Sequence, residues 1–215
     1  MRSEEAKYLA WILAALTPWT EVPQIMSIKV KGKPSIILGA AVAREGIKAE
    51  SKQCSIIAGA FKNYTQITGL KNAIVAKLPH INERDTIGMQ IRGWDNQGGH
   101  WRLQALFAIL VEAMTLCPSK ATSGNESAFE KLFGEWQAFI DHLEGMELMD
   151  VPNEKPIMTG TELSKELGGI KPGVWMRPAL DIVMAWQLRN PDKKHDWTDA
   201  VAEVKSRREE LKIPI

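Results

Sequence analysis

Apolar residues recur at three- and four-residue spacing along almost the whole chain. No stretch shows a run of two-residue alternation bounded by turn signals, so the pattern predicts an all-α fold without significant sheet, an elongated helical array. The helix over 99–117 is apolar on nearly every side from Leu103 to Val111, which predicts a buried central helix. The helices are predicted over 3–16, 34–45, 48–61, 64–78, 83–93, 99–117, 124–146, 160–167, 175–189 and 197–211.

Two breaks divide this helical pattern. Pro118 and the polar residues 122–125 interrupt it, and we place there the boundary between a helical body region over 1–120 and a helical tail region over 121–215. A second linker, 150–156, contains two prolines and leads into the most informative part of the chain.

The segment 158–169 carries local signals for a short helix. Thr159 and Glu162 have the spacing of a capping box, with Met158 and Leu163 placed as the hydrophobic staple that flanks it. The pair at 168–169 is Gly-Gly, which can adopt the left-handed conformation that ends a helix. A helix therefore begins near residue 160 and ends at this pair.

A second helix follows a turn made by Lys171, Pro172 and Gly173. Its apolar residues repeat at helical spacing from Trp175 to Trp186, and an Asn-Pro pair at 190–191 ends it. An open helix N-terminus beside a lysine suits a phosphate, because unpaired N–H groups and partial positive charge meet there. The same residues also describe an ordinary helical corner, and the local pattern leaves both interpretations open.

Composition and charge add one asymmetry. The chain has 215 residues, is 45% hydrophobic and carries a formal net charge of +1, which is typical of a globular protein with a substantial core. Residues 27–80 contain nine basic residues against two acidic ones, whereas residues 121–162 contain nine acidic against two basic. The basic stretch predicts a surface for a polyanion, with solvated helix faces as the alternative. The lysines expected to face phosphate are Lys29, Lys31, Lys33, Lys48, Lys52, Lys62 and Lys71.

The cysteines and the apolar runs indicate the compartment. Cys54 and Cys117 lie in apolar helical surroundings, so neither a disulfide framework nor a metal site is predicted. No run approaches the roughly eighteen apolar residues that span a bilayer. We expect an intracellular protein of the cytoplasm, the nucleus or the mitochondrion, with no membrane partner.

Candidate catalytic patterns are incomplete. The four histidines show no spacing typical of metal ligands, and His195-Asp196 lacks the further ligands of a metal-dependent phosphohydrolase. The run Gly98-Gly99-His100-Trp101-Arg102 is followed by a leucine, with no paired carboxylates nearby to hold Mg²⁺. We therefore predict no catalytic residue and no metal site, and expect this chain alone to be inactive.

Three segments resemble a known family. The run GxxLxxxLGGIKPGxWMxxALDxVMxWQLxNP from residue 160, with ERDTIGMQIRGW (83–94) and WRLQALFAILVEAM (101–114), is similar to the body and tail of eukaryotic, especially fungal, class II tRNA nucleotidyltransferases, the CCA-adding enzymes. Val174 departs from the family, where a second proline often follows Pro-Gly. The resemblance implies a catalytic head with a Gly-Gly-x-x-Arg-Asp loop and a D-x-D metal pair, and a neck with E-D-x-x-R; none of these motifs is found here.

The resemblance implies that this chain is the tRNA-binding C-terminal part of such an enzyme, packed against a head and neck that it lacks. It would hold the acceptor arm and elbow of tRNA, while CTP, ATP and Mg²⁺ serve the intact enzyme and no cofactor binds this chain. The alternatives are a helical protein-interaction module and a helix-hairpin-helix DNA-binding unit built on GGIKPG. The residues expected to bind RNA are Lys171, Gly173, Arg177, Arg189, Lys193, Lys194, Lys205, Arg207 and Arg208, together with Lys29, Lys31 and Lys33.

Overall fold

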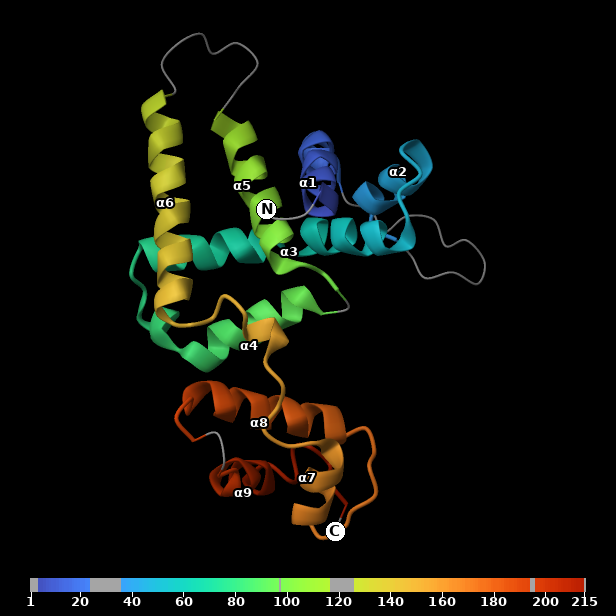
Figure 1. Ribbon diagram of the computed structural model, residues 1–215, viewed down its shortest axis with the longest axis vertical. Coiled ribbons are helices and arrows are strands. Elements are labelled where there is room, and N and C mark those ends of the chain that lie inside the picture. Colours follow the sequence, from blue (N-terminus) through green and yellow to red (C-terminus); the bar gives the residue numbers. More distant parts are fainter. Residues whose placement is uncertain (1–3, 24–35, 97, 117–125, 194–195, 215) are drawn as a thin grey trace. The chain divides into compact units, whose positions relative to one another are not determined.

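The computed structural model describes residues 4–23, 36–96, 98–116, 126–193 and 196–214, and within these ranges it forms helices and no β-strand (Figure 1). This confirms the all-α prediction. None of the helices in these ranges is long and apolar enough to cross a bilayer. The α-helices are α1 (Glu4–Leu16), α2 (Leu38–Gly46), α3 (Ser51–Val75), α4 (Arg84–Asp95), α5 (Trp101–Leu116), α6 (Glu126–Gly145), α7 (Gly160–Glu166), α8 (Met176–Arg189) and α9 (Thr198–Ser206), with 3₁₀ turns at Thr17–Glu21, Pro79–Asn82 and Val151–Asn153.

The chain forms two compact units. The first combines Met1–Pro79 with Gly93–Gly145, and the second combines His80–Arg92 with Met146–Ile215. Helix α6 packs on α3 and α5 in the first unit. The predicted body and tail regions, 1–120 and 121–215, are named after regions of the resembled family, not after compact units of the structure. Their boundary therefore stays a prediction.

Helix α3 organises the first unit. Its 25 residues contact α2, α5 and α6, and Figure 1 shows α5 and α6 crossing it. The predicted break between 48–61 and 64–78 is wrong, because the polar residue Asn63 lies inside the continuous helix. Its side chain is buried and donates to the Gln104 carbonyl Oε1 at 2.9 Å. A polar side chain with a buried partner thus interrupts the apolar pattern without interrupting the helix.

Lys71 is the most deeply buried charge of this unit, with 1% of its surface exposed. Its Nζ lies 3.0 Å from Glu112 on α5 and 3.0 Å from Glu135 on α6, while the Trp136 indole donates to Glu112 at 2.7 Å. The expectation that Lys71 faces phosphate is therefore wrong. Its positive charge is neutralised by Glu112 and Glu135, and these ion pairs join three helices. A count of basic residues along the sequence does not reveal this pairing.

The second unit has its own core. Residues from α7, α8 and α9 pack together there, among them Leu163, Val183 and Val204, all fully buried. Helices α8 and α9 lie side by side (Figure 1). The predicted last helix over 197–211 is shorter, because α9 ends at Ser206 and the chain continues in turns.

The local signals of α7 are confirmed. Thr159 accepts the Glu162 backbone N–H at 3.3 Å, and Glu162 accepts the Thr159 N–H at 2.7 Å, which completes the capping box. At the other end Gly168 and Gly169 have φ of +97° and +77°. Their N–H groups donate to Lys165 at 3.0 Å and Ser164 at 2.8 Å, the pattern of a Schellman motif.

Replacement of Lys71 tests the buried ion pair. We expect Lys71→Ala to lower the free energy of unfolding by about 3 kcal/mol, because two carboxylates then face each other without a cation. Lys62→Ala, an exposed lysine on the same helix, serves as the matched control. Urea denaturation of both variants measures the difference, and equal stability losses would contradict a structural role for Lys71.

The capping box predicts a titration. Hydrogen bonds from the Thr159 backbone N–H and hydroxyl lower the pKa of Glu162 below its ordinary value. The ionised carboxylate therefore stabilises the helix start fully above the unfolded-state pKa of about 4.3, and this contribution is lost as the pH falls through the lower folded-state pKa. NMR titration of the Glu162 carboxyl should give a higher pKa in Thr159→Ala than in the parent. Identical midpoints would show that the hydroxyl contributes nothing.

Candidate nucleic-acid interface

The turn between α7 and α8 presents unpaired donors. Gly173 accepts the Met176 N–H at 3.0 Å, which opens the first turn of α8, and no side chain caps this helix. The backbone N–H groups of Val174, Trp175 and Arg177 have no acceptor among the described residues. Val174 is 92% exposed, so the turn is open to solvent. The geometry of an anion-binding helix start is present.

Two cations flank this turn. Lys171 and Arg177 are both exposed, and neither forms an ion pair or hydrogen bond within the described part of the chain. The first turn of α8 contains no acidic residue. The local charge is therefore positive and available to a partner.

Trp175 lies directly beneath the turn. Its ring is 3% exposed, and its indole Nε1 has no acceptor among the described residues. A buried donor left unpaired costs about 1–3 kcal/mol relative to a paired one. The helical spacing of apolar residues that begins at Trp175 agrees with its burial, but nothing in that spacing indicates the unused N–H group.

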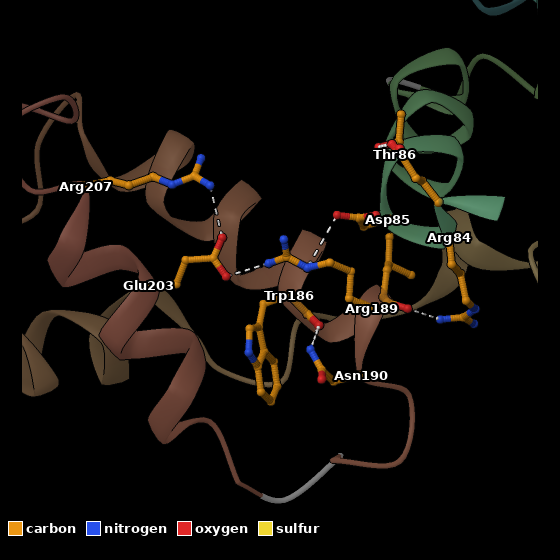
Figure 2. Close-up of polar contacts among 10 residues, drawn as sticks. Arg84, Asp85, Thr86, Trp186, Arg189, Asn190, Glu203 and Arg207 are labelled. Atoms are coloured by element: carbon orange, nitrogen blue, oxygen red, sulfur yellow. Dashed lines mark hydrogen bonds and ion pairs between the residues drawn. The ribbon is translucent and has the colours of Figure 1, made fainter. Parts of the chain in front are cut away.

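At the other end of α8, the basic side chains already form ion pairs with carboxylates. Figure 2 shows Arg189 between Asp85 and Glu203, with Nε–Oδ2 at 3.4 Å and a terminal nitrogen 2.5 Å from the Glu203 carboxylate. Arg207 lies 3.2 Å from the same Glu203. Two arginines expected to bind RNA thus share two carboxylates, and their charges cancel.

Lys193 is paired in the same way. Its amine donates to Asp199 at 2.8 Å and lies 5.9 Å from the centre of the Trp186 ring. The hydrogen bond to Asp199 raises the pKa of the Lys193 amine above its ordinary value. This lysine links the end of α8 to the first turn of α9.

The remaining predicted residues differ in availability. Lys205 is exposed and unpaired within the described residues, whereas Arg208 is partly buried and donates to the Pro214 carbonyl. Lys194, Lys29, Lys31 and Lys33 lie outside the residues that the structure describes.

In the first unit, Lys48, Lys52 and Lys62, three of the lysines predicted to face phosphate, are exposed. Lys52 pairs with Glu5 at 3.0 Å. Within the described ranges, no three His, Cys, Asp or Glu side chains are placed together to hold a metal.

Within the second unit the predicted residues form two groups, not one. Helix α8 has 14 residues and so is about 21 Å long. Lys171, Gly173 and Arg177 lie at its start, and Arg189 and Arg207 meet at its far end. The open group and the paired group are therefore separated by the length of the helix.

Two arginines of α4 were not predicted to have a role. Arg84 donates to the carbonyls of Met146 at 2.9 Å and Leu188 at 2.8 Å, and Arg92 donates to those of Val151 and Glu154 at 2.7 and 2.8 Å. Burial lowers the pKa of Arg92, which Glu154 and Asp181 partly offset. The sequence did mark this segment, because both arginines lie in the run ERDTIGMQIRGW, one of the three segments that carry the family resemblance.

Arg84 borders a cavity in the second unit. Its volume is about 320 Å³, and its lining includes Arg84, Lys155, Glu147 and Glu154. The lining charges balance, and Gln187 in its wall already donates to the Lys155 carbonyl at 3.1 Å and accepts the Ile157 N–H at 2.9 Å. The polar groups of this cavity serve the fold.

Comparison with known proteins identifies relatives of the chain. It is 36% identical to nucleotidyltransferase lcsQ of Purpureocillium lilacinum over the whole chain and 40% of that protein. It is 24% identical to tRNA nucleotidyltransferase cca2 of Schizosaccharomyces pombe, over 88% of the chain and 35% of the relative. It is 27% identical to the mitochondrial CCA tRNA nucleotidyltransferase of Saccharomyces cerevisiae, over 83% of the chain and 31% of the relative.

The chain thus spans between about a third and two fifths of the length of these curated relatives. No protein-family model matches the chain, and no solved structure is significantly similar to it.

A double-mutant cycle tests whether Arg189 is engaged within the protein. We expect Arg189→Ala and Asp85→Ala to be coupled by about 0.2–1 kcal/mol in thermal or urea unfolding, as for other partly exposed pairs. Arg177→Ala, an exposed and unpaired arginine on the same helix, should show no coupling to Asp85→Ala. Equal coupling in the two cycles would contradict the ion pair.

Proposed function

Because this chain is homologous to part of the nucleotidyltransferases, including fungal CCA tRNA nucleotidyltransferases, we propose that it binds tRNA as the helical body and tail of such an enzyme. It would hold the acceptor arm and elbow so that a catalytic head reaches the 3′ end. The observation that carries the proposal is the similarity of 83–88% of the chain to proteins that are named for tRNA nucleotidyl transfer.

Phosphate and shape contacts dominate the proposed binding. A-form RNA hides its base edges in a deep, narrow groove, so a helical surface reaches mainly backbone phosphates and 2′-hydroxyls. The turn before α8 supports such a contact, since Lys171, Arg177 and the neighbouring backbone N–H groups have no partner among the residues that the structure describes. Lys205 is the further open cation of the second unit that we assign to this role.

We expect the cations that are already paired to contribute less to RNA binding. Arg189, Arg207 and Lys193 already hold carboxylates, so an RNA phosphate would have to replace an existing partner. Such exchange returns less free energy than pairing an unpaired cation, because a carboxylate is released into solvent in the same step. We therefore rank the turn above the far end of α8 as the principal phosphate contact.

In this proposal the nucleotide chemistry belongs to other parts of the complete enzyme. CTP, ATP and Mg²⁺ would serve a head and neck against which the chain packs, and the residues described here would position RNA. An intracellular location, including the mitochondrion for which one relative is named, follows from the proposed substrate.

A salt titration of tRNA binding tests the turn. We expect Lys171→Glu to weaken binding uniformly across tRNA sequences and to lower the slope of log affinity against log salt by about 1, because a phosphate contact carries charge but no base information. Lys165→Glu, an exposed lysine on α7 with the same change in net charge, is the control and should retain the slope.

The same titration separates the competing functions. A tRNA-binding protein should prefer tRNA to duplex DNA of equal length and charge, whereas a helix-hairpin-helix DNA-binding unit should prefer the duplex. Absence of salt-dependent binding to either nucleic acid would favour the protein-interaction module and overturn the proposal.

A further inference from the structure

We propose that the indole N–H of Trp175 is an additional phosphate donor at the turn before α8, beside Lys171 and the free backbone N–H groups. The inference rests on the proposed function, since it takes the anion to be a phosphate of an RNA backbone. It adds a buried aromatic residue to a site for which the sequence indicated only cations and a glycine.

The ring of Trp175 is fixed while its donor is unused. It packs in the core of the second unit with Ala179 and Val183, and 3% of its surface is exposed. The Nε1 atom has no acceptor among the described residues. Buried N–H groups in proteins nearly always have an acceptor. A ligand bound at the turn would supply the acceptor that the Trp175 indole lacks.

Gly173 defines where such an acceptor fits. A Cβ atom built on Gly173 would lie 3.3 Å from Cδ1 and 3.4 Å from Nε1 of Trp175, and these two are the atoms it meets within 4 Å beyond its chain neighbours. The Gly173 carbonyl accepts the Met176 N–H at 3.0 Å, so this space lies at the first turn of α8. A side chain at residue 173 would therefore crowd the edge of the indole, which is where we place the anion.

The surrounding charge selects an anion. Lys171 and Arg177 are exposed and unpaired within the described residues, and no acidic residue lies in the first turn of α8. By contrast, the Glu162 and Asp196 carboxylates accept backbone N–H groups at the starts of α7 and α9. Of these three helix starts, that of α8 is the one where no described carboxylate accepts a backbone N–H group.

Trp101 provides an internal comparison. Its indole, at the start of α5 in the first unit, is also buried and has no acceptor in the described part of the chain. There, however, the Asp95 carboxylate already accepts the Trp101 backbone N–H at 2.7 Å. A second anion would meet this fixed negative charge, so the same combination of features does not form a site at α5.

The donor set indicates the class of anion. An indole N–H, several backbone N–H groups and one or two flexible cations form a set of several donors, which suits a tetrahedral oxyanion with several acceptor oxygens. Most donors are neutral, so the site matches the single negative charge of a phosphodiester. The ring cannot stack on a base, because its faces are buried in the core.

The experiment follows the tryptophan indole resonances of the full chain in ¹⁵N–¹H correlation spectra. Trp175→Phe assigns the Trp175 signal, and Trp186→Phe, in the same core, controls for loss of an indole elsewhere. We expect the Trp175 signal to move downfield on titration with inorganic phosphate and with tRNA, and Lys171→Glu to suppress the shift. Trp175→Phe should weaken phosphate binding about three- to tenfold, the loss of one neutral hydrogen bond.

Gly173→Ala tests the position independently of the indole. Its methyl group occupies the proposed anion space, so phosphate should no longer shift the Trp175 signal although the indole is intact. A Trp175 signal that stays fixed while the backbone signals of Val174 and Arg177 shift would overturn the inference and leave the turn as a phosphate contact. tRNA binding with no shift at this turn would overturn both site assignments, and loss of tRNA binding altogether would overturn the proposed function.

Discussion

A cation removed from water must be paired, and this requirement governs both units of the protein. In the first unit Lys71 joins α3 to α5 and α6 through Glu112 and Glu135. In the second, Arg84 and Arg92 satisfy backbone carbonyls of the segment that follows α6. These contacts join separate segments of each unit, and by consuming donors they also determine which basic residues stay available to a partner.

The far end of α8 shows how this selection operates. Arg189 and Arg207 are basic and exposed enough to attract RNA, yet Asp85 and Glu203 already neutralise them. At the start of the same helix, no carboxylate of the described residues performs this role. A single helix therefore has one end committed to internal structure and another whose donors are unpaired, a difference that the count of lysines and arginines conceals.

Sequence reasoning succeeded where the signals are local. The capping box at Thr159 and the glycine pair that ends α7 depend on residues within a few positions, and the structure forms both. It failed where a residue's role depends on a distant partner. Two helices, 48–61 and 64–78, were predicted where α3 is continuous, because Asn63 between them has its partner, Gln104, 41 positions away. For the same reason the pairing of Arg189 with Asp85 and the unused Trp175 indole N–H have no sequence signature.

The cancellation of charge around Glu203 has a kinetic consequence. Fields from opposite charges held within a few ångströms fall off quickly with distance, so the far end of α8 exerts little pull on a polyanion still in solution. The unpaired cations at the start of the helix keep their longer-range attraction. An approaching polyanion would thus be drawn to the start of α8 more strongly than to its far end, and its first encounter with this helix would be oriented before any contact forms.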